Sequence, residues 1–166
     1  MMGFTIKGSL RLFCLAAVIL ATACTQVDLF EKSVNIKGGG WSAGQQPEIE
    51  LNISDTMAFY KIFLVVRHTN SYSYRNLWVK VGLQQPGDTI ARNSIFEVPL
   101  AGPDSWNGTG VNDVYEWRGL LFPQPLRFRQ PGLMKFTIYQ IMRQNPLRGI
   151  LQVGIRLEPA TTPSST

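Results

Sequence analysis

Apolar and polar residues alternate with a period of two along much of the chain. Between residues 48 and 53, for example, Ile49, Leu51 and Ile53 occupy every second position, and polar residues occupy the positions between them. The same alternation recurs at 60–68, 77–83, 96–100, 114–122, 136–138 and 151–157. A period of two places successive side chains on opposite faces of a β-strand, so each segment predicts a strand with one face toward a core.

Residues that favour turns separate these short strands. Pro86-Gly87 and Pro131-Gly132 each stand between predicted strands, and no long segment has a helical period. The pattern predicts an all-β fold, a single antiparallel β-sandwich domain of about seven to eight strands. We expect the sandwich to span residues 37–158, followed by a flexible tail at 159–166.

The first 23 residues have the organisation of a signal peptide. Lys7 and Arg11 precede an apolar run at 12–23. Because this run is shorter than the roughly 20 residues that cross a bilayer, export is a better interpretation than a permanent transmembrane helix. We expect a signal peptide at 1–23 and a short lipidated segment at 24–36 before the sandwich.

The small residues directly before Cys24 resemble the lipobox of bacterial lipoproteins, whose cysteine receives the lipid and becomes the first residue of the mature chain. Ala21 stands where that pattern commonly has leucine, and Ala21-Thr22-Ala23 also fits an ordinary A-x-A cleavage site. Lipidation of Cys24 is favoured, because ordinary cleavage would leave a lone thiol at the N-terminus of an exported protein.

Thr25 and Gln26, which directly follow Cys24, are not acidic, and this resembles the sequence of lipoproteins sorted to the outer membrane. We therefore expect a protein anchored by lipid in the cell envelope, on the periplasmic face of the outer membrane. The two or three acyl chains of such an anchor, at ~0.8 kcal/mol per buried methylene, hold a protein durably. No cofactor is expected beyond this covalent lipid.

Length and cysteine content narrow the function classes. The chain has 166 residues, which is enough for one ordinary domain with one core. Its two cysteines, Cys14 and Cys24, both lie in the first 24 residues. This position excludes a disulfide scaffold and a cysteine-rich metal site in the folded domain.

The charge is mildly basic and unevenly distributed. Loss of residues 1–23 removes Lys7 and Arg11 from the 16 basic residues and none of the 11 acidic ones, which leaves a net charge of +3. After Trp117 the sequence has seven basic residues and a single acidic one, Glu158. Nucleic acid is not an expected partner of an exported protein, so anionic lipid headgroups, glycans or an acidic protein surface are the expected partners.

No group of residues predicts an active site. His68 is the one histidine of the sequence and falls on the apolar face of its strand, where a structural role is expected. Glu48 and Glu50 share a strand face, but a solvated outer face explains them better than an acid–base pair. We therefore expect a non-enzymatic protein without a metal site.

Two kinds of residue are candidates for contact with a partner. Trp78 alternates with core residues, so its ring should point outward. Arg127 and Arg129 flank Phe128, so both guanidinium groups should emerge on one face, where they suit pairing with carboxylates or phosphates. The sequence favours the arginines as the main contact with a partner or a membrane surface, with the Trp78 face as the alternative.

The other tryptophans, Trp41, Trp106 and Trp117, lie in or beside predicted loops. Aromatic residues in the loops of a β-sandwich are also typical of carbohydrate-binding modules, whose rings stack on sugars. A glycan-binding module is therefore the alternative function.

Four separate stretches resemble one family. They are DLFEKSVNI (28–36), VVRHTNSYSYRNLWVKV (65–81), DVYEWRGLLF (113–122) and YQIMRQNPLRGILQVGIRLEP (139–159). In this order they resemble the GldH family of gliding-motility lipoproteins of Bacteroidetes-type bacteria. The resemblance implies a Sec signal, a lipidated cysteine at the position of Cys24, and a role with other proteins of the gliding and type IX secretion machinery. It implies no biochemical activity.

Two short patterns predict a modification. Asp55-Thr56-Met57 and Asp88-Thr89-Ile90 resemble the O-glycosylation signal of exported Bacteroidetes proteins. Both lie in predicted turns between strands, where a glycosyltransferase has access. Thr56 and Thr89 are therefore candidate glycosylation sites.

Overall fold

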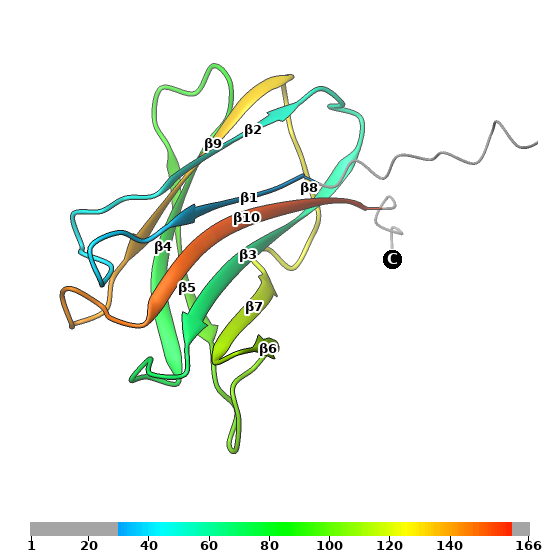
Figure 1. Cartoon of the computed structure of the whole chain (residues 1–166). Helices are drawn as coiled ribbons and strands as arrows, with labels where there is room; N and C mark the ends of the chain where they lie inside the picture. The colour runs from blue at the N-terminus through cyan, green and yellow to red at the C-terminus, as the bar shows by residue number, and fades with distance from the viewer. Residues whose placement is uncertain (1–29, 161–166) are drawn as a thin grey trace, which may run out of the picture.

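The structure, a computed structural model, describes residues 30–160 and contains two antiparallel sheets that pack face to face (Figure 1). The strands are β1 (Phe30–Asn35), β2 (Glu48–Ile53), β3 (Phe59–Thr69), β4 (Asn76–Gln84), β5 (Arg92–Pro99), β6 (Thr109–Val111), β7 (Val114–Leu120), β8 (Leu126–Arg127), β9 (Gly132–Gln140) and β10 (Ile150–Ala160). The described residues contain no helix. The all-β prediction with antiparallel sheets is confirmed, but the predicted count of seven to eight strands is too low.

The sequence pattern does not predict β1, β6 and β8. β6 has 3 residues and β8 has 2, so neither is long enough for alternation to be visible. β1 is an edge strand in which only Phe30 and Val34 are partly buried, so it lacks a clear apolar face. This strand precedes residue 37, where we expected the sandwich to begin, and β10 extends beyond residue 158. The predicted signal peptide and Cys24 lie outside the described residues.

The longest strands lie at the centre of the first sheet. Its order is β1-β10-β3-β7-β6, and β8 pairs with the start of β3. β3 and β10 have 11 residues each and pair antiparallel along their length. The second sheet has the order β2-β9-β4-β5.

The core fills the space between the sheets with the alternate side chains that the sequence predicts. Buried residues from the four central strands are Ile62, Leu64 and Val66 of β3, Leu77, Val79 and Val81 of β4, Met134, Phe136 and Ile138 of β9, and Val153, Ile155 and Leu157 of β10. Burial of a side chain of this size contributes about 1.5–3 kcal/mol. The predicted inward faces of these strands are confirmed except at Leu151, which is 37% exposed, because an irregularity between Ile150 and Gln152 breaks the alternation and Ile150 is buried instead.

Trp41 also belongs to the core, although its place in a loop made it a candidate for stacking on sugars. Its side chain is fully buried, and its Nε1 donates to the carbonyl oxygen of Gln45 at 2.8 Å. Its backbone pairs in both directions with that of Leu147. A surface ligand cannot reach this ring, which removes one support for the glycan-binding alternative.

The register of the first sheet defines two ends of the molecule. Phe30, the start of β1, pairs with Leu157, which in turn pairs with Ile62 near the start of β3. Arg127 of β8 pairs with Phe59 at the very start of β3. The chain therefore enters the domain near β8, and we call this end of the sandwich the entry end.

Three connecting segments, 54–58, 85–91 and 121–131, meet at the entry end, toward the top and right of Figure 1. The opposite end, which we call the far end, carries the connections at 70–75 and 141–149. The two groups of candidate contact residues lie at different ends, as described below.

His68, near the end of β3, is fully buried in an aromatic cluster at the far end. Its ring lies 4.6 Å from that of Trp106 and 5.7 Å from that of Tyr115, between ring centroids. Its Nδ1 lies 3.0 Å from the carbonyl oxygen of Thr69, and its Nε2 has no hydrogen-bond partner among the described residues. Desolvation by burial lowers the pKa of His68, and the hydrogen bond to Thr69 opposes this shift.

This histidine predicts a pH dependence of stability. Because the folded-state pKa lies below the unfolded value of about 6.5, the unfolded chain binds the proton more readily. The neutral ring therefore contributes its full stability above that value, and this contribution is lost as the pH falls below it. Since His68 is the single histidine, we expect His68→Gln to abolish the change in unfolding free energy between roughly pH 7.5 and pH 5.5. Urea unfolding at both pH values measures this change, and an unaltered slope in the variant would contradict the assignment.

Candidate functional site

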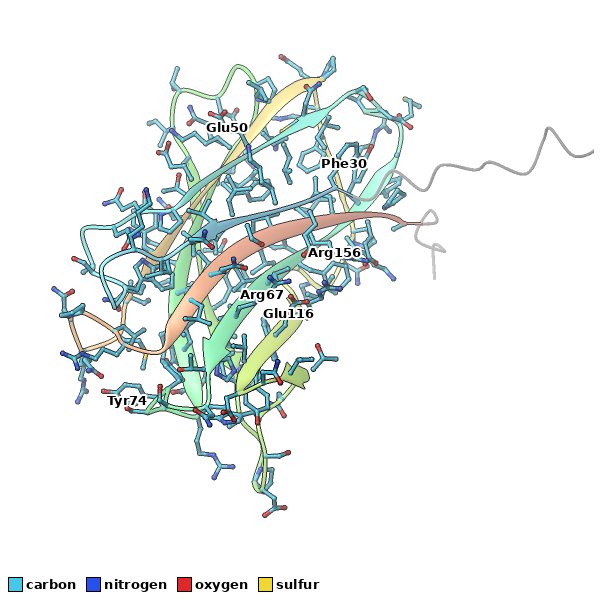
Figure 2. The ribbon with its side chains drawn as sticks, viewed as in Figure 1. Phe30, Glu50, Arg67, Tyr74, Glu116 and Arg156 are labelled. Atoms are coloured by element: carbon cyan, nitrogen blue, oxygen red, sulfur yellow. The ribbon has the colours of Figure 1, made fainter. Side chains whose placement is uncertain are left out.

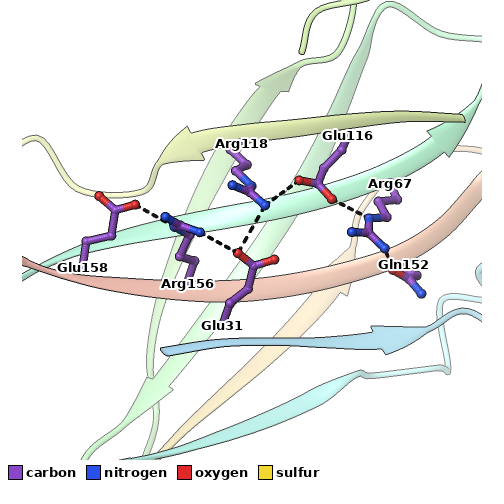
Figure 3. Close-up of polar contacts among 7 residues, drawn as sticks. All are labelled: Glu31, Arg67, Glu116, Arg118, Gln152, Arg156 and Glu158. Atoms are coloured by element: carbon purple, nitrogen blue, oxygen red, sulfur yellow. Dashed lines mark hydrogen bonds and ion pairs between the residues drawn. The ribbon is translucent and has the colours of Figure 1, made fainter. Parts of the chain in front are cut away.

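A ladder of charged side chains crosses the outer face of the first sheet (Figure 3). Its members are Glu31 of β1, Arg156 and Glu158 of β10, Arg67 of β3, and Glu116 and Arg118 of β7, with Gln152 of β10 at one end. Arg118 Nη2 lies 2.7 Å from Glu116 and 3.4 Å from Glu31, so it joins β7 to β1 across two intervening strands. Arg156 Nη1 reaches the same Glu31 oxygen at 3.1 Å.

The ladder alters the predicted distribution of charge. Its three arginines are balanced by three glutamates, and two of these, Glu31 and Glu116, precede residue 118 in the sequence. Hydrogen bonds to Glu158 and Glu31 raise the pKa of Arg156. The C-terminal half of the chain is basic in sequence, but this face of the folded domain is not a free basic surface.

The outer face of the second sheet holds a further pair. Lys135 Nζ lies 2.7 Å from a carboxylate oxygen of Glu48 on the neighbouring strand, and this hydrogen bond raises the pKa of Lys135. Glu48 and Glu50 are both exposed, as expected for a solvated face. Glu48 therefore has a cationic neighbour and is not the free half of an acid–base pair.

The predicted arginine pair lies at the entry end. Phe128 is buried between Arg127 and Arg129, and its ring packs 5.5 Å from that of Tyr60. Arg127 Nε donates to the carbonyl oxygen of Thr56 at 2.8 Å, and Arg129 Nη2 lies 2.8 Å from Asp88. Both arginines line one hollow of about 280 Å³, so the structure places them on the same face, as predicted.

A larger cleft of about 430 Å³ adjoins the same two arginines. Arg92 of β5 also lines it and makes no ion pair or hydrogen bond with another side chain of the described residues. The apolar part of its lining is formed by Leu83, Phe122, Leu126 and Phe128. Guanidinium groups and apolar side chains in one cleft suit a ligand that joins an anionic group to an apolar part.

The two predicted glycosylation sites also lie at the entry end. Thr89 is exposed and follows Asp88, the partner of Arg129. Thr56 is half-buried, and its carbonyl oxygen accepts the hydrogen bond from Arg127. Both threonines lie between strands as expected, and their glycosylation stays a prediction.

Trp78 lies toward the far end, and its side chain is 40% exposed, as the alternation of β4 predicts. It lines a hollow of about 250 Å³ with Tyr74, Ile141, Met142 and Arg143. We call these five residues the Trp78 patch. Figure 2 shows Tyr74 at the end of the molecule opposite to Phe30. Sequence analysis missed four of the five residues, because they come from two connections that meet only in the folded domain.

The patch is held in place by its own contacts. The Tyr74 hydroxyl donates to Gln144 Oε1 at 2.8 Å, and the backbone N–H of Trp78 lies 3.3 Å from the sulfur of Met142. The backbone N–H of Ile141 donates to the Trp78 carbonyl oxygen at 3.0 Å. Tyr74 and Ile141 remain 37% and 42% exposed, so the surface combines fixed geometry with exposed apolar area.

Trp106 and Trp117 are half-buried, unlike the exposed Trp78. Both pack against the core, and Trp106 is also part of the cluster around His68. Within residues 30–160, no three His, Cys, Asp or Glu side chains are arranged to hold a metal ion. This same part of the chain has no helix long and apolar enough to span a membrane.

Known proteins resemble this chain over most of its length. The gliding motility lipoprotein GldH homolog of Christiangramia forsetii is 28% identical over an alignment of 149 residues that covers 85% of this chain and 90% of that protein. The gliding motility lipoprotein GldH of Flavobacterium johnsoniae is 27% identical over an alignment of 152 residues that covers 87% of this chain and 92% of that protein. A solved structure from Desmodium yellow mottle tymovirus covers 82% of this chain and 91% of its own, but a TM-score of 0.29 at 11% identity supports no conclusion about the fold.

The family model described as GldH lipoprotein matches residues 28–157, from just before β1 almost to the end of β10. This match includes strands of both sheets, the ladder except Glu158, the entry-end arginines and the Trp78 patch. The family expected from the four sequence stretches is thereby confirmed. The chain belongs to the GldH lipoprotein family.

Proposed function

We propose that this chain is a lipid-anchored, non-enzymatic component of the cell-envelope machinery for gliding motility, linked to type IX secretion. The observation that carries the proposal is the family match over residues 28–157 together with the names of the two relatives, which are both called gliding motility lipoproteins. In this proposal the protein sits on the periplasmic face of the outer membrane and binds other proteins of the machinery.

The anchor in this proposal is the lipid on Cys24. Cys24 stands six residues before Phe30, the first residue of β1. Because the anchor is chemically separate from the core between the sheets, the domain does not need it in order to fold. Acyl chains contribute ~0.8 kcal/mol per buried methylene, so two or three of them hold a protein durably at a membrane.

The state of the acid–base groups supports a non-enzymatic role. His68 is fully buried among aromatic rings and cannot touch a substrate at the surface. Glu116 is bound by Arg67 and Arg118 within the ladder. A general acid or base has to reach the proton that it transfers, and neither group has such access.

The Trp78 patch is the proposed contact with a partner protein. Tryptophan, tyrosine and arginine are the residues that most often dominate the binding energy of protein interfaces, and the patch contains one of each. It lies at the far end, away from the point where the chain enters from its anchor. Arg127 and Arg129, the other predicted contact residues, face in a different direction.

Glycan binding is the second candidate, because the exposed Trp78 ring lies beside Tyr74. A sugar would stack on the indole face, whereas a protein would fill the hollow with a side chain. Binding to a glycan array separates the two functions. The first function predicts no sugar specificity, and a defined glycan ligand would favour the second.

The anchor proposal is tested by Cys24→Ala. We expect the variant to be folded but to leave the detergent phase in Triton X-114 partitioning, since it has no residue to acylate. Cys14→Ala is the matched control and should partition like the parent. A Cys24→Ala chain that still enters the detergent phase would show that lipid is not what holds the protein at the membrane.

The patch proposal is tested by Trp78→Ala. Loss of an interface residue of this kind costs about 2 kcal/mol, which is roughly a thirtyfold loss of affinity. We expect crosslinks from the far end to a partner to disappear in intact native cells, and gliding to be impaired at an unchanged protein level. Ile95→Ala, at a 61% exposed position of β5 outside the patch, is the control. Equal crosslinking and gliding in both variants would contradict the proposal.

A further inference from the structure

The entry end lies within a short reach of the proposed lipid anchor. Six peptide units separate Cys24 from Phe30, and a fully extended chain spans at most about 3.3–3.6 Å per residue, so β1 begins at most about 22 Å from Cys24. Phe30 lies at the level of Ile62, three residues from the Phe59–Arg127 pair. A lipid on Cys24 therefore brings the entry end, and not the far end, next to the bilayer surface.

Two of the most exposed large apolar side chains of the described residues lie at this end. Ile90 is 79% exposed in segment 85–91, and Met57 is 71% exposed in segment 54–58. An apolar side chain exposed at the tip of a loop costs free energy in water. This free energy is recovered when a lipid or protein surface covers the side chain. Val111, at 72%, is comparably exposed but lies on β6 toward the far end.

An arginine contacts Met57, and another lies close to Ile90 in the sequence. Arg127 Nη2 lies 3.0 Å from the sulfur of Met57, and Arg92 follows Ile90 by two residues. The third arginine, Arg129, is 59% exposed although it pairs with Asp88. Guanidinium groups bind phosphate oxygens through paired hydrogen bonds. At a membrane surface the arginines would meet the headgroup phosphates, and the apolar side chains would meet the acyl chains.

The acidic groups of the entry end limit its electrostatic attraction to anionic lipid. Asp88 is bound to Arg129, and Asp55 accepts hydrogen bonds from the backbone N–H groups of Met57 and Ala58. Three arginines against these two aspartates leave a net charge of only +1 in the three segments and at Arg92. Attraction to anionic lipid is therefore a modest addition to the contact that Met57 and Ile90 make.

We propose that the entry end rests on the bilayer, with Met57 and Ile90 inserted among the headgroups and Arg92, Arg127 and Arg129 bound to lipid phosphates. This inference rests on the proposed lipidation of Cys24. The anchor and the entry end then hold the domain in one orientation, with the Trp78 patch directed away from the membrane. O-glycans on Thr56 or Thr89 would hold this end off the bilayer, so the two interpretations of these loops exclude each other.

Hydrogen–deuterium exchange tests the proposal on the lipidated full chain in protein-free vesicles. The vesicles contain phosphatidylethanolamine with or without phosphatidylglycerol, and the Cys24→Ala chain in solution is the reference. We expect slower exchange at 54–58, 85–91 and 121–131 on vesicles and unchanged exchange at 141–149. The protection should be lost in a Met57→Ser and Ile90→Ser double variant and kept in Val111→Ser.

Arginine variants test the phosphate contacts. Arg127→Gln with Arg129→Gln should lose the additional protection that phosphatidylglycerol provides, and this loss should match the effect of added salt on the parent. Arg148→Gln, at an arginine that forms no ion pair among the described residues and lies outside the Trp78 patch, is the control at the far end.

Four results would overturn the inference. The first is equal exchange at the entry end on vesicles and in solution, and the second is protection at 141–149 instead. The third is protection that appears only in native membranes, which indicates a protein partner. The fourth is a glycan on Thr56 or Thr89, detected in the intact mass of the native protein. The mass of the N-terminal peptide separates this failure from that of the proposed function. A lipidated peptide without protection removes the inference alone, whereas a peptide without lipid removes both.

Discussion

The pairing of β3 with β10 is the constraint on which the rest of the molecule depends. These strands are far apart in sequence, yet they pair along nearly their whole length, from Ile150 opposite His68 to Ala160 opposite Phe59. The other strands of the first sheet add to this pair: β1 pairs with β10, β7 and β8 pair with β3, and β6 pairs with β7. Since β3 begins at the entry end and finishes at the far end, this single pairing also decides which residues meet at each end.

Strict alternation predicts the strands that carry the core, because their buried positions are set by the pleat of the strand itself. The inward faces of β3, β4, β9 and β10, and the outward ring of Trp78, follow from this rule. β6 and β8 are too short to show it, and β1 is an edge strand without a clear apolar face. The position of Trp41 in a loop did not reveal its burial, since burial there depends on Leu147, more than a hundred residues later.

The candidate sites were also predictable to different degrees, because some depend on local spacing in the sequence and others on contacts between distant segments. The shared face of Arg127 and Arg129 is a local property of spacing, whereas the composition of the Trp78 patch depends on how two connections meet. The ladder depends on strand order. Glu31 of β1 and Arg118 of β7 are far apart in sequence, and the strand order β1-β10-β3-β7 brings them together on one face. A Cβ at Gly154 would come within 2.2 Å of Ser33 Oγ, so this position shows how closely β1 and β10 approach.

The position of β1 has a mechanical consequence. β1 is both the edge strand of its sheet and the first strand after the proposed anchor, so a pull between the membrane and a partner at the far end would act along its length. Antiparallel hydrogen bonds run perpendicular to the strands, and the register of β1 and β10 continues from Phe30 opposite Leu157 to Asn35 opposite Gln152. Such a load shears all these bonds together instead of opening them one at a time, and the ion pairs of Glu31 with Arg156 and Arg118 brace the loaded end of the strand. With the proposed anchor and partner in place, the pairing of β1 with β10 would therefore carry such a load.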